Sequence, residues 1–272
     1  MLRPTGLLKR AFLRGALFAF WFALLAPALA WAADCLAFRA DEWVTPVYVY
    51  DGDTLKLEDG RKLRLLGINT PEIGRDGTPS EALAHEARQA LVDLVAQQPR
   101  LALRYEQQRQ DRYGRLLAHA FLSDGRNLQQ LLLQRGLAAA VAIAPNLANF
   151  DCYLAAEDGA QGQGIWRLPE YQGIATTALP SDAGGFRVVQ GRVKRVGESR
   201  QAYWLNFAGG FAARIDKRDL PRFARVLDVD QLQGRTLKLR GWLYQVRGQT
   251  RLNLYHPRAL QLLPSGAGPV LP

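Results

Sequence analysis

The chain has 272 residues, of which 48% are hydrophobic, and a formal net charge of +10. This composition supports a packed core and excludes a wholly disordered chain, and the length allows one large domain or two small ones. Its two cysteines and three histidines show neither the CxxC nor the HExxH spacing, which argues against dithiol redox chemistry and zinc hydrolysis.

The first 33 residues differ from the rest of the chain. Arg3, Lys9, Arg10 and Arg14 precede the apolar run GALFAFWFALLAPALA. This run of about sixteen residues is shorter than the roughly 20 that a membrane span needs. We therefore expect a cleaved signal peptide over residues 1–33 and a periplasmic or secreted protein with no stable membrane insertion after cleavage. An uncleaved N-terminal anchor is the alternative.

The charge is unevenly divided over the rest of the chain. Residues 34–183 hold 15 Lys/Arg and 20 Asp/Glu, a net charge of −5, whereas residues 184–272 hold 16 and 5, a net charge of +11. Such asymmetry predicts two modules, one of them built for an anionic partner. We expect a catalytic domain over residues 34–171, a linker at 172–185 and a basic domain over 186–264.

In chain order, the first domain shows two kinds of periodicity. Alternating residues predict strands at 42–50, 53–58, 61–68, 101–107 and 115–123. Helical spacing predicts a helix that begins at a capping box formed by Thr78 and Glu81, and further helices within 127–138 and 149–166. Five strands with a helix after the third predict an α+β fold built on the five-stranded, partly open barrel of an oligonucleotide-binding (OB) fold, with three helices.

Four charged side chains fall at one mouth of this barrel. Asp53 shares the inward face of its strand with Leu55 and Leu57. Glu72 follows Pro71 and therefore belongs to a loop. Arg64 and Arg115 lie on the third and fifth strands. Guanidinium groups beside carboxylates suit phosphoryl chemistry, because they stabilise charge on the phosphate oxygens while a carboxylate activates water. Each arginine alone could equally be a solvated surface charge.

Three stretches carry a family resemblance: DGDT (51–54), RLLGINTPE (64–72) and DRYGR (111–115). They resemble the signature stretches of the staphylococcal nuclease-like (thermonuclease) family, and the likeness extends over roughly residues 43–167. The resemblance implies a calcium-dependent phosphodiesterase that cuts DNA and RNA and leaves 3′-phosphate ends.

The resemblance also implies a role for each matching residue. Glu72 would be the general base, and Arg64 and Arg115 would bind the phosphate. The implied Ca²⁺ ligands are Asp53, Asn69 and the main-chain carbonyl of Thr70, with Asp51 in the outer shell and Tyr113 beside the nucleotide. The chain departs from the family twice: Asn69 replaces an aspartate, and AAAVAIAPN (138–146) lacks a base-stacking tyrosine.

Cys35 and Cys152 are the only cysteines of the chain. In an oxidising compartment two cysteines pair more often than they stay free. We therefore expect a disulfide between them; two unpaired thiols are the alternative.

The basic domain repeats the order of three strands, a helix and two strands. Strands are expected at 186–196, 201–208, 211–217, 235–246 and 250–257, and a helix at 220–232. This order predicts a second, smaller OB-like barrel. Basic and aromatic residues share strand faces, which suits phosphate contacts and base stacking. The expected nucleic-acid-binding residues are Arg192, Lys194, Lys238, Arg240, Trp242 and Tyr244. Alternatively, Trp242 and Tyr244 pack under a loop or against the catalytic domain.

Taken together, these features predict a monomeric, secreted or periplasmic calcium-dependent nuclease that acts on DNA and/or RNA. A catalytically weak nucleic-acid-binding protein on the same scaffold is the alternative. A third possibility is a structural envelope protein whose basic domain meets anionic lipid.

Overall fold

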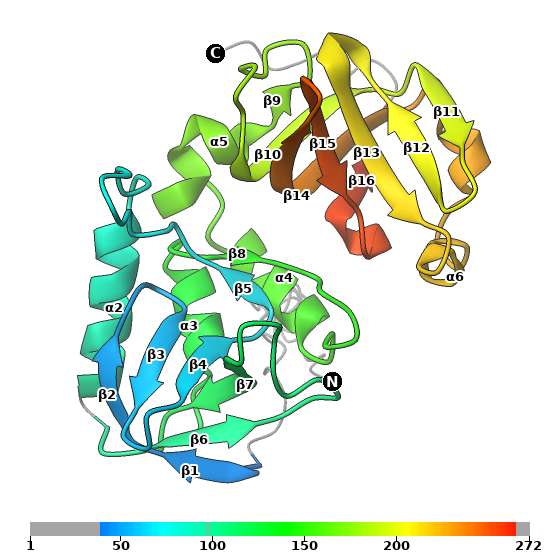
Figure 1. Ribbon diagram of the computed structural model, residues 1–272. Helices are drawn as coiled ribbons and strands as arrows, with labels where there is room; N and C mark the ends of the chain where they lie inside the picture. The colour runs from blue at the N-terminus through cyan, green and yellow to red at the C-terminus, as the bar shows by residue number, and fades with distance from the viewer. Residues whose placement is uncertain (1–38, 97, 265–272) are drawn as a thin grey trace, which may run out of the picture. The chain divides into compact units, whose positions relative to one another are not determined.

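The computed structural model describes residues 39–96 and 98–264, which belong to one compact unit of residues 33–272. The predicted signal peptide and Cys35 lie outside the described residues. Within the described part of the chain, no helix combines the length and the hydropathy needed to cross a bilayer. The fold is α+β, as predicted (Figure 1).

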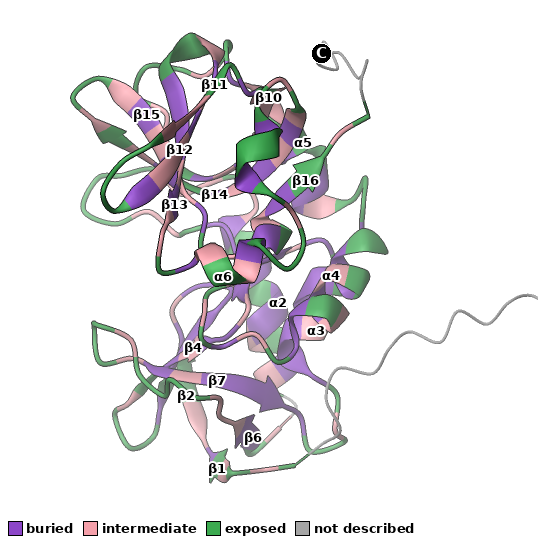
Figure 2. Ribbon diagram, turned by 90° about the vertical axis from the view of Figure 1, so that its right-hand side faces the viewer, coloured by how far each residue is buried: buried purple, intermediate pink, exposed green. Residues whose placement is uncertain are grey.

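The N-terminal half is built on a six-stranded sheet. Its order is β1 (Glu42–Val44), β6 (Leu101–Arg104), β7 (Leu116–Phe121), β4 (Lys62–Leu65), β3 (Thr54–Leu57) and β2 (Pro46–Val49). β4 and β7 pair in parallel, and all other neighbours are antiparallel. β7 is buried along almost its whole length (Figure 2).

The single strand predicted at 42–50 is two strands at opposite edges of this sheet. β1 pairs with β6, whereas β2 pairs with β3, and only Thr45 separates them in sequence. Pro46 has no N–H to give to a ladder, so a continuous central strand cannot run through it. The same stretch of chain therefore serves both edges of the sheet.

Short elements follow and surround the sheet. They are β5 (Ile68–Asn69), which pairs with β8 (Ala139–Ala140), α2 (Ala84–Ala96), α3 (Leu128–Gln134), α4 (Phe150–Asp158), η1 (Gly164–Arg167) and α5 (Pro169–Gln172). Asn127 caps α3, because its side chain accepts the N–H of Gln130.

The capping box predicted at Thr78 and Glu81 does not form. α2 begins only at Ala84, and Leu83 immediately before it has a φ of +65°, in the left-handed region. The Glu81 carboxylate instead accepts the backbone N–H of Glu72. A tertiary contact thus takes the side chain that the local motif would have used.

The C-terminal half is built on a second sheet. Its order is β11 (Arg195–Glu198), β12 (Ala202–Asn206), β13 (Phe211–Asp216), β15 (Gln249–Asn253), β14 (Thr236–Val246), β10 (Gly185–Arg192) and β9 (Ile174–Ala175), and β16 (Leu260–Leu262) pairs with β14. β10 and β11 are consecutive in sequence yet far apart in this order, as β1 and β2 are in the first sheet. β13 and β15 pair in parallel. The two sheets therefore share one pattern of strand connections.

Three local features of this half differ from the predictions. The expected first strand, 186–196, is divided between β10 and β11. The stretch 172–185 contains β9, which pairs with β10 and so joins the second sheet. The helix predicted at 220–232 is wrong as one element: it is α6 (Leu220–Phe223) and η3 (Val229–Leu232), and Asp228 caps the second through the N–H of Asp230.

The buried apolar residues form three clusters. One fills the N-terminal half and one the C-terminal half. The third joins Ile165, Trp166 and Tyr171 to Phe186 and Val188 of β10. The two halves therefore meet through packed apolar side chains.

Candidate active site

The turn before β3 brings two carboxylates into the protein. Asp51 and Asp53 are 5% and 1% exposed, and the N–H of Asp53 donates to Asp51 Oδ1 at 3.1 Å. A Cβ at Gly52 would lie 2.8 Å from side-chain atoms of Thr70 and Ala87. Glycine at this position therefore lets the turn approach α2 and the segment after β5.

The carboxylate of Asp53 is held by three donors. Arg64 Nη2 lies 2.9 Å from Oδ2, which also accepts the Thr70 N–H at 3.1 Å, and the Thr54 hydroxyl and Oδ1 are 3.0 Å apart. Arg64 Nη1 donates to the carbonyl of Leu65 at 2.8 Å, which fixes the guanidinium. Burial raises the pKa of Asp53 to about 7 against the opposing charge of Arg64.

β5 leads directly into the segment Thr70–Pro71–Glu72. Asn69 and Thr70 are buried, and the Asn69 side-chain amide donates to the Thr70 carbonyl at 3.3 Å. The backbone of Glu72 is held twice by Glu81: its N–H donates to Glu81 Oε2 at 2.9 Å, and its carbonyl accepts the Glu81 N–H at 3.0 Å. These bonds fix the main chain of Glu72 while its side chain stays accessible.

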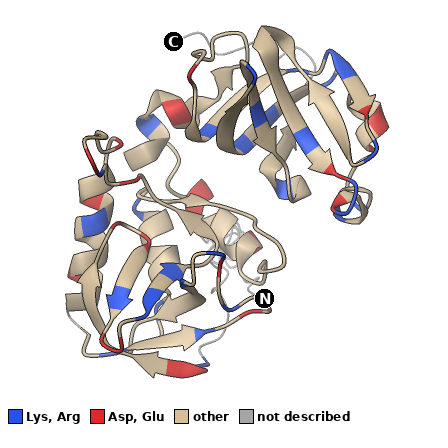
Figure 3. Ribbon diagram, in the orientation of Figure 1, with Lys and Arg blue, Asp and Glu red and all other residues tan. Residues whose placement is uncertain are grey.

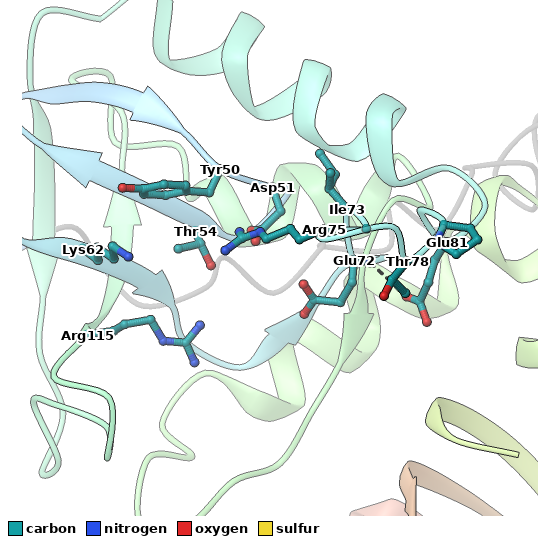
Figure 4. A pocket seen from close by; sticks show the side chains of 12 residues that line it. Tyr50, Asp51, Thr54, Lys62, Glu72, Ile73, Arg75, Thr78, Glu81 and Arg115 are labelled. Atoms are coloured by element: carbon teal, nitrogen blue, oxygen red, sulfur yellow. Dashed lines mark hydrogen bonds between the residues drawn. The ribbon is translucent and has the colours of Figure 1, made fainter. Parts of the chain in front are cut away.

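The Glu72 carboxylate and the Arg115 guanidinium project into one cavity of about 520 Å³, with Asp51 on its wall (Figure 4). Arg115 comes from the start of β7, where Asp111 Oδ2 accepts its Nε at 2.7 Å. Although Glu72 is accessible from the cavity, burial by the surrounding protein raises the pKa of its carboxyl group. The charges of Asp51 and Glu81 act in the same direction, while Arg64 and Arg115 oppose them.

Three further residues of this cavity escaped the sequence analysis: Tyr50, Lys62 and Arg75. Lys62 Nζ lies 5.0 Å and Arg75 Cζ 5.9 Å from the centroid of the Tyr50 ring. The sequence pattern could have placed Lys62 at this site, because it lies two residues before Arg64 on the same strand and therefore on the same face. Arg75 gave no comparable signal, since it lies in an irregular loop.

Tyr113 is 68% exposed on the loop before β7. The guanidinium carbons of Arg112 and Arg115 lie 4.7 and 5.6 Å from its ring centroid. The N–H of Tyr113 donates to Asp111 Oδ1, the atom that also accepts the N–H of Arg115. One aspartate therefore orients both predicted substrate contacts on this loop.

The oxygen atoms near Asp53 are suitable ligands for a hard divalent cation. Among the described residues, no three His, Cys, Asp or Glu side chains form a cluster that could bind a metal by themselves. However, the carboxylates of Asp51 and Asp53 and the carbonyl of Thr70 are oxygen donors of the kind that Ca²⁺ prefers. The charge of Arg64 lowers the pKa of Asp53, whereas those of Asp51 and Glu72 raise it, and a bound cation would offset the repulsion among these carboxylates.

The predicted binding residues of the C-terminal half do not form one surface. Arg192 and Lys194 are exposed and line a separate cavity of about 300 Å³. Arg240 Nη1 lies 2.8 Å from Oε1 of the buried Glu157 in the N-terminal half. Burial and the charge of Arg240 lower the pKa of the half-buried Lys238.

The two predicted aromatic residues also have partners. The ring of Trp242, 39% exposed, makes an edge contact with Phe186 at 5.2 Å between centroids. The Tyr244 hydroxyl and Asn253 Oδ1 are 2.8 Å apart. Both of these contacts are made within the C-terminal half.

A different aromatic and basic group was missed. Two guanidinium groups lie near the ring of Trp204 on β12, with Arg214 Cζ at 5.8 Å and Arg251 Cζ at 4.8 Å from its centroid. Figure 3 shows Lys and Arg on several strands of this half. The group escaped notice because Arg214 and Arg251 lie on separate strands that only tertiary structure brings beside β12.

Cys152 lies in α4 and is not a free thiol. Its expected partner, Cys35, is outside the described residues, so the disulfide stays a prediction.

Parts of the chain are similar to known proteins. Residues 62–167 match the family described as staphylococcal nuclease homologue. The chain is 36% identical over 104 residues to a thermonuclease of Staphylococcus hyicus, covering 37% of this chain and 60% of that protein. It is 33% identical over 128 residues to endonuclease YncB of Bacillus subtilis (strain 168), covering 44% and 60%. A thermonuclease of Staphylococcus intermedius is 35% identical over 101 residues, covering 36% and 59%.

The chain spans about 60% of the length of these curated relatives. Arg64, Glu72 and Arg115 fall within the matched residues, whereas Asp51 and Asp53 precede the matched family segment. The motifs, the cavity and these matches lead to one assignment: residues 62–167 belong to the staphylococcal nuclease-like family.

Proposed function

We propose that the protein is a calcium-dependent nuclease that hydrolyses phosphodiester bonds of DNA and/or RNA. The observation that carries the proposal is the cavity in which Glu72, Arg115 and Asp51 meet (Figure 4). A carboxylate and a guanidinium facing the same space are the groups needed to activate water and to stabilise a phosphate.

Each residue has a distinct part in this reaction. The Glu72 carboxylate accepts a proton from the attacking water, and a raised pKa brings it closer to the ideal of a base at neutral pH. Arg64 and Arg115 donate to the phosphate oxygens as negative charge builds on them. Asp53, the Thr70 carbonyl and the Asn69 side chain would hold Ca²⁺, with Asp51 in the outer shell, and the bound ion supplies Lewis-acid stabilisation of the phosphate. Tyr113 lies beside the nucleotide.

We further propose two OB-like barrels, a catalytic one and a basic one. The shared strand order supports this, because in each half one early stretch of chain pairs near both ends of the strand order and the third and fifth strands are parallel. The net charge of +11 over residues 184–272 and the grouping of Arg214 and Arg251 near the ring of Trp204 support a nucleic-acid-binding role for the second barrel. In this proposal the protein is secreted or periplasmic, acts as a monomer and leaves 3′-phosphate ends.

A plasmid-degradation assay tests the proposal. The wild-type protein should cut DNA with Ca²⁺ and stop when a chelator is added. Glu72→Gln should lose at least about 100-fold, the usual scale for general-base catalysis. Glu58→Gln, an exposed change at the end of β3 outside the cavity lining, is the matched control. DNA binding without cleavage by the wild-type protein would instead favour the weakly catalytic binder.

A further inference from the structure

The backbone of the catalytic residue Glu72 is connected to the C-terminal sheet. Glu81 holds this backbone through two hydrogen bonds, one from its own N–H and one to its carboxylate. The other oxygen of that carboxylate, Oε1, lies 3.6 Å from Nη1 of Arg187 on β10. Arg187 Nη1 also donates to the carbonyl of Phe186 at 2.7 Å, so the guanidinium has a fixed direction.

A second connection reaches the other end of the same segment. β5, which precedes Thr70, pairs with β8 through Ile68–Ala140 and Asn69–Ala139. The N–H of Ala140 donates to Oε2 of the buried Glu157 at 2.6 Å. Arg240 on β14 lies 2.9 Å from that oxygen and also reaches the Ala140 carbonyl at 3.3 Å.

The two arginines come from adjacent places in one sheet. Val188 of β10 is paired with Arg240 of β14, so Arg187 and Arg240 are neighbours across the ladder. The Arg240 guanidinium also lies 5.6 Å from the centroid of the Trp166 ring, within the apolar cluster that joins the halves. This packing holds the Arg240 guanidinium in place, while the hydrogen bond to the Phe186 carbonyl directs that of Arg187.

We propose that Arg187 and Arg240 are positioning residues for catalysis, which fix the segment 68–72 from its two ends through Glu81 and Glu157. Neither arginine touches the reacting atoms in this scheme. The C-terminal sheet is then part of the catalytic apparatus and more than an anchor for substrate. The inference rests on the proposed nuclease function, because it assigns these residues to the placement of Glu72.

The physical basis is the sensitivity of catalysis to placement. A shift of about 1 Å in a catalytic group lowers the rate by about 100-fold. Residues that orient the groups around an active site commonly account for about 10- to 100-fold in activity. A loosened Glu72 would still admit substrate, because the cavity and its arginines remain. The loss should therefore fall on kcat and leave KM nearly unchanged.

The first experiment compares Arg187→Gln, Arg187→Lys and Glu81→Ala, alone and with Arg187→Gln and Glu81→Ala combined. The substrate is a short oligonucleotide with Ca²⁺, and the matched control is Arg195→Gln, an exposed arginine of β11 in the same half. We expect Arg187→Gln to lower kcat by about 10-fold with KM changed less than about twofold. Lysine should restore most of the rate, and Arg187→Gln should add nothing once Glu81 is alanine. An unchanged kcat, a loss confined to KM, or additive losses in the double variant would each overturn the proposal.

Amide hydrogen exchange gives a readout that needs neither metal nor turnover. The peptide that contains Glu72 should exchange faster in Arg187→Gln and in Glu81→Ala, and at the wild-type rate in Arg195→Gln. For Arg240, the variant Arg240→Met combined with Glu157→Gln removes both charges and keeps an acceptor for the Ala140 N–H. It should speed exchange at residues 139–140 and 68–69, and wild-type exchange there would contradict the proposal.

The two proposals fail in different ways. If the wild-type protein does not cleave, or if Glu72→Gln leaves cleavage intact, the nuclease assignment fails whatever the exchange data show. If cleavage depends on Glu72 but neither arginine affects kcat or exchange, only the positioning role fails.

Discussion

The buried ion pair between Glu157 and Arg240 should make Arg240→Met strongly destabilising. Glu157 is 0% exposed, and the Arg240 side chain is 19% exposed. At the observed 2.8 Å the attraction is about 6 kcal/mol for an effective dielectric constant of ~20. Desolvation of both groups offsets much of it, but removal of one partner strands the other charge. We expect the free energy of unfolding to fall by about 3–5 kcal/mol.

The matched variant is Arg240→Met combined with Glu157→Gln. Glutamine keeps an oxygen to accept the Ala140 N–H but carries no charge, so the desolvation penalty is removed with the attraction. Replacement of a whole buried pair is often neutral. The double variant should therefore be more stable than Arg240→Met alone, although it contains one more substitution.

Thermal and urea unfolding measure this difference. A loss of 1 kcal/mol lowers the Tm of a protein of this size by about 2–4 °C, so Arg240→Met should unfold roughly 6–20 °C below wild type. The deficit should shrink at low pH. Burial raises the pKa of Glu157 above the ordinary 4.5, and without Arg240 it rises further. The loss of stability of Arg240→Met is therefore complete once the pH exceeds the pKa of Glu157 in the folded variant. It disappears as the pH falls toward 4.5, because the buried carboxyl group is then protonated and neutral.

Two results would refute this reasoning. One is a deficit below about 1 kcal/mol at neutral pH, the scale of an exposed ion pair. The other is a double variant that is as unstable as the single one, because the cost would then come from lost packing of the Arg240 guanidinium against Trp166.

Three other changes test separate parts of the protein. Asn69→Asp should tighten Ca²⁺ binding, because a charged ligand replaces an amide. Equal or weaker binding in a calorimetric titration would mean that this side chain does not face the ion. Glu106→Gln should lower the free energy of unfolding in urea by about 1–3 kcal/mol. The reason is that the Glu106 carboxylate contacts His119 Nε2 at 2.7 Å and accepts the N–H of Leu147 at 2.8 Å. An unchanged urea midpoint would show that these bonds make no net contribution to stability. Trp204→Ala should weaken binding of single-stranded DNA by about 1–3 kcal/mol in a fluorescence titration, with unchanged kcat on a short oligonucleotide. Full binding would exclude Trp204 as a platform for a base.

The positions of most strands, and the meeting of Glu72 with Arg115, could be predicted because the information is local. Alternation placed Leu55 and Leu57 on the buried face with Asp53 at its end, and the structure buries all three. Pro71 placed Glu72 in a loop after a strand, and the structure brings its carboxylate into the cavity with Asp51 and Arg115. These conclusions need only the period of a strand and the covalent limits of proline.

The errors arose where a side chain is used by a distant part of the chain. The motif at Thr78 and Glu81 satisfies the local rule for a capping box, but the carboxylate of Glu81 is bound to the Glu72 N–H, nine residues away. Alternation also placed Arg240 and Trp242 correctly on the face opposite Leu239 and Leu243. It could not show what covers that face. A strand pattern specifies two sides, and only the packed structure specifies what each side meets.

The contacts between the halves change the meaning of the charge asymmetry. A basic half joined by a free linker would act only as an electrostatic anchor, and its loss would leave the catalytic barrel intact. Here the stretch expected to be a linker supplies β9 to the second sheet. Phe186 and Val188 of that sheet are buried with Trp166 and Tyr171 of the other half. Without the C-terminal sheet, these aromatic rings would face water and Glu157 would lose its guanidinium partner. The basic half is therefore bound to the N-terminal half by burial and by charge, and any role it has in holding nucleic acid is added to this structural one.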